Sequence, residues 1–230
     1  MKNITGEKAN RDLRGRLLET VNFVSKEDLE GKDILDIGCG YGWFELNALN
    51  RGVSKITAME VTENDLKTIK TEIKDKKVDF RVGSATKLPF EDNKFDTAVC
   101  WEVVEHIPKN EENIMLNEIH RVLKSNGVLY LTAPNNSFFA NILDPAWFFG
   151  HRHYGVHHLR DLVSDKFQIT DLQVKGGLWS VLGILNMYVS KWVFRRKPIF
   201  KEFFNKKEDV EYKGSQGFVN IFLKCQRKKV

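Results

Sequence analysis

A glycine-rich run follows a short apolar stretch near the start of the chain and carries a clear chemical signal. Its pattern is Asp36-x-Gly38-x-Gly40-x-Gly42. Glycine lets a backbone bend sharply and approach a ligand closely, and the start of a following helix presents amide N–H groups to that ligand. A dinucleotide-binding loop would have its third glycine where this chain has the bulky Trp43. An acidic residue before the first glycine suits a ligand with a cationic amino group, which Asp36 could meet directly or through water.

A second acidic residue, Glu60, stands near the end of the next apolar run, at 55–61. In a doubly wound sheet, that position faces the ligand crevice outside the carboxyl ends of the strands. A carboxylate there can accept hydrogen bonds from both hydroxyls of a ribose, and Val61 could pack on an adenine ring. The alternative is that Glu60 is a favourable charge at the start of a following helix.

Titratable residues that could act on an acceptor molecule follow two later apolar runs. Glu105 and His106 come after the run 95–101. His106 is a candidate general base because imidazole titrates near neutrality. The alternative is that this pair caps the loop and orients its neighbours.

Four of the six histidines fall within residues 151–158. We interpret this segment as an acceptor-binding loop in which His151 or His153 acts as a base and Arg152 grips a phosphate or carboxylate. A metal site is a competing interpretation because the histidine spacing could chelate, but the segment lacks convincing Cys or carboxylate partners, and we predict no metal. Packing of structural histidines is the third interpretation.

The elements that position these groups alternate between helical and strand patterns along the chain. We therefore expect an α/β fold: a doubly wound, Rossmann-like, mostly parallel seven-stranded sheet with a final antiparallel strand and a helical insertion before it. The last two strands, 167–174 and 218–225, could pair antiparallel. Helices are predicted at 11–24, 41–50, 64–74, 111–123 and 159–164, and the earlier strands at 32–37, 55–61, 78–82, 95–101 and 128–132.

Several ordered motifs resemble those of the class I S-adenosylmethionine-dependent methyltransferases. The likeness is strongest to the subgroup with a GDAxxLPFxxxxFD motif, which stands here as residues 83–96. An ExxEHI motif follows at 102–107, and an EIxRVLKxGGxLxLTxPN motif at 118–135. The resemblance is close over about residues 30–135 and loose beyond them. It implies S-adenosyl-L-methionine as cofactor, bound by Asp36, Gly38, Cys39, Gly40, Gly42, Glu60, Val61, Ser84, Ala85, Thr86, Cys100, Trp101 and Glu102.

Ser84 departs from the family pattern, and Trp101 could contact the sulfonium of the donor. Ser84 stands where the family usually has an Asp that contacts the adenine amino group. A hydroxyl can accept that hydrogen bond, but without charge assistance, so the backbone of Ala85 and the side chain of Thr86 would hold more of the adenine. Trp101 could stack near the sulfonium because an aromatic face attracts a cation.

An aromatic and basic segment interrupts the alternating order before the last strand. Residues 178–194 form a 17-residue apolar run with two polar interruptions, which is short of the roughly 20 residues of a membrane span. It fits an interfacial or lid-forming helical hairpin, or an extra core helix over the sheet edge. Residues 191–230 contain 12 Lys and Arg against 4 acidic residues. That excess suggests an anionic partner, such as a membrane surface met through 178–213, although a solvated lysine-rich surface has the same composition.

We expect one methyltransferase domain over residues 1–230 that modifies a small-molecule, lipid-linked or glycan-linked acceptor, with O-methylation favoured. Its predicted parts are an N-terminal helix in 11–30, a cofactor-binding core at 31–135, an acceptor-side region at 136–177, an aromatic-basic insertion at 178–217, and a last strand with a basic tail at 218–230. A nucleic-acid methyltransferase and a non-catalytic S-adenosylmethionine-binding module are the alternatives. Three widely spaced cysteines and a polar N-terminus favour a cytoplasmic location, with the inner membrane face as one option.

Overall fold

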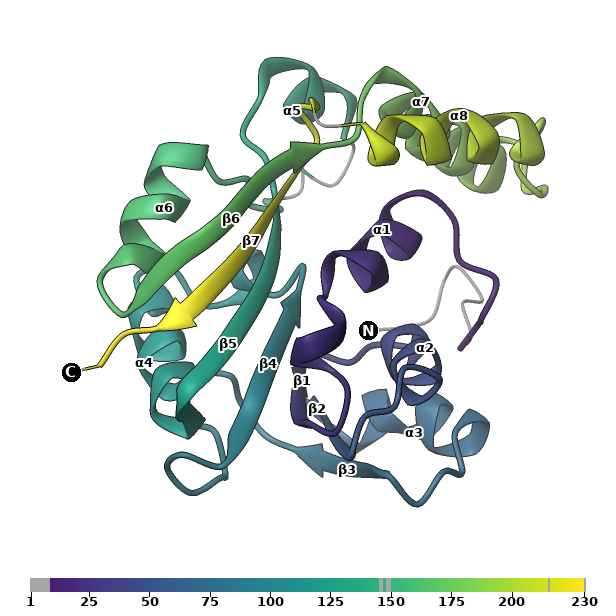
Figure 1. Cartoon of the computed structure of the whole chain (residues 1–230). Coiled ribbons are helices and arrows are strands. Elements are labelled where there is room, and N and C mark those ends of the chain that lie inside the picture. The colour runs from purple at the N-terminus through teal and green to yellow at the C-terminus, as the bar shows by residue number, and fades with distance from the viewer. Residues whose placement is uncertain (1–8, 145–146, 148–149, 215, 230) are drawn as a thin grey trace.

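The computed structural model describes residues 9–144, 147, 150–214 and 216–229. Their strands form one seven-stranded sheet in the order β3-β2-β1-β4-β5-β7-β6 (Figure 1). The first five strands pair in parallel, and β7 pairs antiparallel with both β5 and β6. This confirms the predicted sheet and the antiparallel pairing of its last two strands. The strands are β1 (Asp33–Ile37), β2 (Lys55–Glu60), β3 (Val78–Val82), β4 (Phe95–Trp101), β5 (Leu123–Pro134), β6 (Phe167–Lys175) and β7 (Asn220–Arg227).

Helices cover both faces of the sheet, as a doubly wound fold requires. In Figure 1, α1, α2 and α3 lie on one side and α4 and α6 on the other. Each side has its own apolar core, and β4 contributes to both because its side chains alternate: Ala98 and Cys100 join one core, Val99 and Trp101 the other. The helices are α1 (Gly15–Phe23), α2 (Trp43–Leu49), α3 (Glu63–Glu72), α4 (Glu112–Val122), α5 (Phe138–Leu143), α6 (Val156–Ser164), α7 (Leu178–Tyr188) and α8 (Lys201–Lys213).

The predicted boundary between α4 and β5 was wrong. The turn-like run 125–127 suggested that the helix continues to Leu123 and that a strand begins at Val128. Instead α4 ends at Val122, and β5 begins at once with Leu123 opposite Phe95 of β4. Leu123 pairs with Phe95, and regular pairing resumes only at Val128 opposite Thr97, so the turn-forming residues 125–127 lie in an irregularity of β5 between these two pairs.

The aromatic-basic insertion forms a helical hairpin of α7, a π-helical turn at Val189–Val193, and α8. The Glu211 carboxylate of α8 accepts N–H bonds from Gly177 (3.1 Å), Trp179 (2.8 Å) and Ser180 (2.8 Å), so α8 caps the start of α7. The hairpin also reaches the N-terminal helix, where Asp209 accepts the Gly15 N–H at 2.6 Å.

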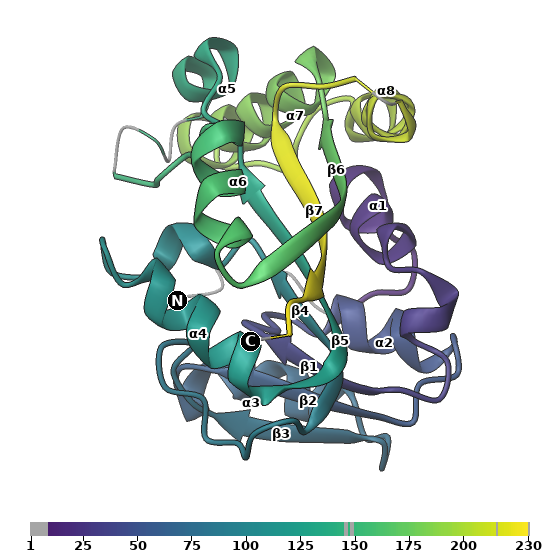
Figure 2. The same ribbon diagram turned by 60° about the vertical axis from the view of Figure 1, so that its left-hand side comes forward.

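In both views the hairpin lies with α5 at the same end of the molecule, and α7 contacts α5 (Figures 1 and 2). Of the two forms that the sequence left open, the structure has the hairpin. None of the helices in the described part of the chain is long and apolar enough to cross a bilayer.

Candidate functional site

The strand order places the candidate site between β1 and β4. The chain leaves β1 toward β2 and β3 on one side and later continues through β4 to β5 on the other, so the order reverses between these two strands. Ligands of open α/β sheets bind in the crevice at such a switch point, outside the carboxyl ends of the strands. Ile37, Glu60 and Trp101 end β1, β2 and β4 at this edge.

The glycine loop turns from β1 into α2 through left-handed backbone at Gly38 (φ 76°), Gly40 (φ 54°) and Gly42 (φ 81°). Gly42 is also needed for space, because an added Cβ would lie 2.6 Å from the Ile69 side chain. At Gly40 an added Cβ would meet no atom within 4 Å. The loop is therefore tightly packed at its end and open in its middle, which is where a ligand can approach the backbone closely.

Glu60 connects the end of β2 to this open part of the loop. Its Oε1 accepts the Gly40 N–H at 2.7 Å. Burial raises the pKa of Glu60, while the N–H bonds from Gly40 and Val61 oppose that rise. Val61, the next residue, is 66% exposed. Glu60 thus lies beside the loop and Val61 is accessible, and the roles predicted for them with the ribose and the adenine stay predictions.

Asp36 faces a second carboxylate, Glu45, in the first turn of α2. Both residues are fully buried, and apart from their contact with each other their carboxylate groups have no hydrogen-bond partner in the described part of the chain. Burial, and then the neighbouring Glu45, raises the pKa of Asp36, and burial raises that of Glu45 to about 7. Two such carboxylates must share a proton or receive a cation. This fits a ligand with a cationic amino group.

Sequence reasoning missed Glu45. A usable signal was present, because Glu45 stands beside Phe44 and one turn before Ala48, which are both buried against the sheet. A carboxylate on the apolar face of a helix is costly unless it has a partner or a ligand.

The remaining predicted cofactor residues follow β3 and β4. The hydroxyls of Ser84 and Thr86 lie 2.9 Å apart, and Ala85 is buried. Cys100 is fully buried, and the Trp101 ring packs against Phe44 and Tyr130 with ring centroids 5.7 Å and 6.5 Å away. The Trp101 Nε1 is buried without a hydrogen-bond partner in the described residues. The predicted contact of Trp101 with the sulfonium stays a prediction.

Glu102 follows Trp101 in a left-handed conformation (φ 55°), which is strained for a residue other than glycine. Its Oε2 accepts a hydrogen bond from Asn220 Nδ2 at 3.0 Å and lies 3.7 Å from the Arg16 guanidinium. These contacts join the end of β4 to β7 and α1. The other carboxylate oxygen has no hydrogen-bond partner among the described residues.

Three titratable side chains meet just beyond β4. Glu105 and His106 lie in a single 3-10 turn (Val104–His106), and His151 comes from the loop after α5. His151 Nε2 lies 3.8 Å from Glu105 Oε1, and the His106 and His151 ring centroids are 5.1 Å apart. Desolvation, and then His151, lowers the pKa of His106, and burial followed by Glu102 raises that of Glu105. We call Glu105, His106 and His151 the imidazole–carboxylate cluster.

His153 and Arg152 bond to other residues of this region, which differs from the ligand contacts that the sequence suggested. The two ring nitrogens of His153 contact Asn141 Oδ1 (2.7 Å) and Asp144 Oδ2 (3.1 Å), so His153 offers no free nitrogen to an acceptor. The Arg152 guanidinium donates to Glu112 (2.5 Å) and to the carbonyl oxygens of Val104, Glu105 and Ile107. The interpretation that Arg152 grips a phosphate or carboxylate of a ligand is therefore wrong. Arg152 holds the turn after β4 against the 150–154 loop.

Within the described residues, the buried side-chain polar atoms without a hydrogen-bond partner all gather at this edge of the sheet. They come from β1, α2, the end of β4 and the segment after it, together with one histidine of the facing loop. Native proteins leave few such atoms unsatisfied, and each one needs an explanation such as a missing ligand. The residues are Asp36, Glu45, Trp101, Glu102, Glu105 and His151.

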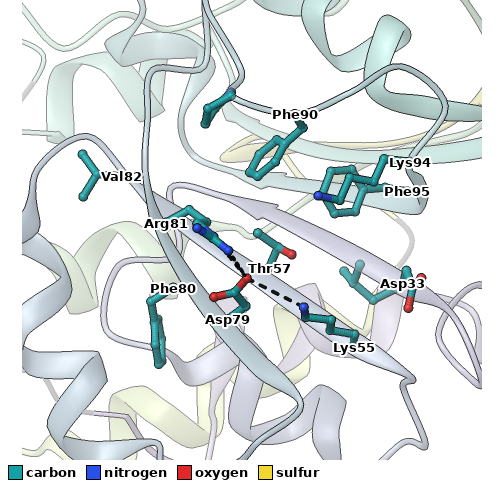
Figure 3. A pocket seen from close by; sticks show the side chains of 12 residues that line it. Asp33, Lys55, Thr57, Asp79, Phe80, Arg81, Val82, Phe90, Lys94 and Phe95 are labelled. Atoms are coloured by element: carbon teal, nitrogen blue, oxygen red, sulfur yellow. Dashed lines mark hydrogen bonds and ion pairs between the residues drawn. The ribbon is translucent and has the colours of Figure 1, made fainter.

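Two of the hollows that the described residues form bear on where the site lies. One of about 640 Å³ opens beside the 150–154 loop and is lined in part by Trp147, His151 and His158. The other, of about 540 Å³, appears in Figure 3, where Asp79 is paired with Arg81 (2.9 Å) and Lys55 (3.7 Å). It lies near Asp33, Lys55 and Phe95, the first residues of β1, β2 and β4, and thus at the edge opposite the glycine loop. We assign it no role in the candidate site.

Comparison with known proteins shows similarity to methyltransferases. Residues 35–131 match the family model of a methyltransferase domain. A ubiquinone biosynthesis O-methyltransferase of Xanthomonas oryzae is 28% identical over 150 residues, which cover 62% of this chain and 62% of that protein. A demethylmenaquinone methyltransferase of Lactococcus lactis is 35% identical over 105 residues, which cover 44% and 41%. The chain thus spans less than two thirds of the length of these relatives.

A solved structure shares the fold over nearly the whole chain. The crystal structure of the cyclase SpnF superimposes with a TM-score of 0.70 at 20% sequence identity, covering 99% of this chain and 90% of that one. At this identity the likeness shows the fold alone, because one fold hosts many activities.

Proposed function

We propose that the chain methylates a small-molecule acceptor with S-adenosylmethionine as donor, and the proposal starts from the match of residues 35–131 to a methyltransferase domain. The observation that carries the proposal is the pair of unpartnered, buried carboxylates beside an open glycine loop. A ligand with a cationic amino group and a ribose matches the charges of Asp36 and Glu45 and the position of Glu60.

Each group at the crevice has a proposed task. Asp36, with Glu45 behind it, holds the amino group of the donor, and Glu60 accepts hydrogen bonds from the ribose hydroxyls. Val61 and the 84–86 turn enclose the adenine. The segment 100–102 borders the place where the methyl group is presented. S-adenosylmethionine supplies the electrophilic methyl group, and the chain contributes mainly position and charge.

The acceptor meets the methyl group beside the imidazole–carboxylate cluster. We favour oxygen as the accepting atom because this cluster can remove a hydroxyl proton. The acceptor oxygen bonds to the methyl carbon while the S–C bond breaks, its electron pair stays on sulfur, and the hydroxyl proton passes to the cluster or to water. His106 and His151 are the candidate bases. The names of the relatives, which include quinone methyltransferases, favour a small aromatic acceptor over nucleic acid.

A methyl-transfer assay in cell extract tests the proposal. The protein is incubated with S-adenosylmethionine that carries a labelled methyl group, and lipids, small molecules, nucleic acids and proteins are then separated. We expect the label in the lipid or small-molecule fraction. Label in nucleic acid would favour the alternative acceptor. Donor binding without any transfer would favour a non-catalytic binding module.

We propose in addition that the hairpin contacts an anionic membrane surface, which would bring a lipid-linked acceptor to the site from the inner face of the cytoplasmic membrane. Its tip exposes apolar side chains, among them Trp192 (60%), Phe194 (57%) and Phe200 (74%). Residues 191–201 include five Lys and Arg and no acidic residue. Apolar side chains beside basic ones suit the interface of an anionic bilayer, where each basic residue contributes about 1 kcal/mol.

Point variants of the hairpin tip test the membrane contact. We expect Trp192→Ala/Phe194→Ala and Arg195→Gln/Arg196→Gln/Lys197→Gln each to weaken binding to phosphatidylcholine–phosphatidylglycerol vesicles by about 10-fold or more, because apolar burial and charge attraction are lost. Vesicle cosedimentation measures the effect. These variants leave the α8–α1 contact and the Glu211 cap in place, so affinity for S-adenosylmethionine should not change.

The matched control is Lys67→Gln/Lys74→Gln/Lys76→Gln, which removes the same number of exposed positive charges around α3. It should bind vesicles like the unaltered protein. Equal binding by all three variants, or loss in the control alone, would remove the membrane proposal and leave the methyl-transfer proposal intact.

A further inference from the structure

We propose that the imidazole–carboxylate cluster binds one divalent transition-metal ion through Glu105, His106 and His151. One possible ligand atom from each residue lies within 4.8 Å of the other two. Ligands around a metal at about 2.1 Å are roughly 3.4 Å apart in a tetrahedral shell. The separation of 3.8 Å between His151 Nε2 and Glu105 Oε1 is close to that value, so small side-chain movements complete the site.

Glu105 supplies an independent indication of a ligand. Its side chain has 0% exposure, and neither carboxylate oxygen has a hydrogen-bond partner in the described residues. A buried carboxylate without donors is costly, and a bound cation removes that cost. Arg152 lies near but donates no hydrogen bond to this carboxylate, because it donates to the Glu105 backbone carbonyl and to the Glu112 carboxylate.

The residues behind His151 resemble the outer shell of a metal site. His151 Nδ1 lies 3.6 Å from Asp144 Oδ2, on the side of the ring opposite the nitrogen that faces Glu105. Asp144 also contacts His153, which in turn contacts Asn141. A metal-binding histidine commonly presents its second nitrogen to a carboxylate, which fixes the ring orientation and increases its basicity. Asp144 is in place for that task.

Asp144, His151 and His153 form a second possible ligand group. We favour the first group because both nitrogens of His153 already have partners, whereas the Glu105 carboxylate has none in the described residues. The two groups share His151, so one ion occupies one of them. Variants of Glu105 and His153 separate the two assignments.

The ligand set indicates the kind of ion. Two imidazoles and one carboxylate suit Zn²⁺, Mn²⁺, Fe²⁺ or Co²⁺ better than Mg²⁺ or Ca²⁺, which prefer oxygen ligands. Three protein ligands leave coordination positions open. On the premise of the proposed methyl transfer, an acceptor hydroxyl takes an open position and loses its proton more readily there. The acceptor class is then a phenol or alcohol, favourably one with two neighbouring oxygens that can chelate the ion.

Metal binding is measured without donor or acceptor, on tag-free protein that has been treated with a chelator and dialysed. Calorimetry with Zn²⁺ and the visible absorption spectrum with Co²⁺ are the two readouts. We expect one ion per chain. Glu105→Gln and His151→Gln should each weaken binding by at least 100-fold, and Asp144→Asn by about 10- to 100-fold.

His157→Ala is the matched control, since His157 is an exposed histidine of α6 outside the cluster, and it should bind the ion like the unaltered protein. Glu105→Gln removes a buried charge and should not lower the melting temperature of the metal-free protein, so its loss of metal cannot reflect unfolding.

Absence of stoichiometric binding would overturn the inference, and so would equal loss in His157→Ala. If His153→Gln lost metal binding while Glu105→Gln kept it, the assignment of the ligands would be overturned. Methyl transfer that is unaffected by chelation would leave the proposed function standing without the metal. Metal binding without methyl transfer would support the metal site and remove the proposed function.

Discussion

Asp36→Asn is expected to weaken S-adenosylmethionine binding by about 100-fold or more, while the ligand-free protein stays at least as stable as before. The variant keeps the shape of the side chain and removes the charge that faces the donor amino group. Loss of one member of a buried, hydrogen-bonded charge pair costs about 2–5 kcal/mol, which is the source of the expected affinity loss. Stability does not fall, because the charge is buried beside Glu45 without a donor in the described residues.

Calorimetry and thermal unfolding measure the two effects. Asp161→Asn is the matched control, because Asp161 is an exposed carboxylate on α6, and neither quantity should change there. An unchanged affinity in Asp36→Asn would contradict the assigned role. A large loss of stability would show that Asp36 serves the fold and not the ligand.

The same carboxylates give the donor affinity a pH dependence. Burial raises the pKa of Asp36, and it raises that of Glu45 to about 7. Because these pKa values are higher in the folded than in the unfolded chain, the folded form binds more protons, and the pair costs stability as pH rises from about 4.5 through 7. A cationic ligand favours the ionised pair. Donor affinity should therefore increase over this interval in the unaltered protein, with proton release on binding, and the increase should be smaller in Asp36→Asn.

Glu60→Ala is expected to weaken donor binding by about 100-fold, and Glu60→Gln by about 10-fold. Hydrogen bonds to a charged acceptor contribute about 1.5–3 kcal/mol, and glutamine keeps one neutral acceptor oxygen. Part of the loss comes from the glycine loop, because Glu60 also accepts the Gly40 N–H at 2.7 Å.

Adenosine distinguishes the two acidic positions in a competition assay. It has the ribose but no charged amino group, so Glu60→Ala should weaken its binding and Asp36→Asn should not. Glu63→Gln is the control, since Glu63 is an exposed carboxylate in the first turn of α3. Equal adenosine affinity in Glu60→Ala and Glu63→Gln would remove the ribose role.

Much of the sheet could be predicted because its strands are short, buried and bounded by glycine or polar residues. The runs that contain Asp36 and Glu60 are each followed by a helix, and that order alone places both acidic residues at one edge. Motif spacing then indicated the resemblance to methyltransferases, and residues 35–131 match the model of a methyltransferase domain. The start of β5 at Leu123 could not be predicted, because it depends on the pairing of that one residue with Phe95 of β4, whereas regular pairing begins at Val128.

The candidate site was harder to predict because its contacts join segments far apart in the sequence. The sequence shows histidines at 151–158. Only the fold shows that His151 lies beside the Glu105 carboxylate and that Arg152 bonds to the turn that contains Glu105. Glu45 was missed because its partner, Asp36, lies on another element. The strained backbone of Glu102 and its bond to Asn220 depend on β7, more than 100 residues later.

Calorimetric titration of the unaltered chain with S-adenosylmethionine tests the central claim most directly. The crevice of Asp36, Glu45 and Glu60 beside the glycine loop predicts saturable binding of one donor molecule per chain and no binding of a nicotinamide dinucleotide, for which Trp43 replaces the required glycine. Absence of donor binding, or tighter binding of the dinucleotide, would contradict the assignment of this edge of the sheet as a methyl-donor site.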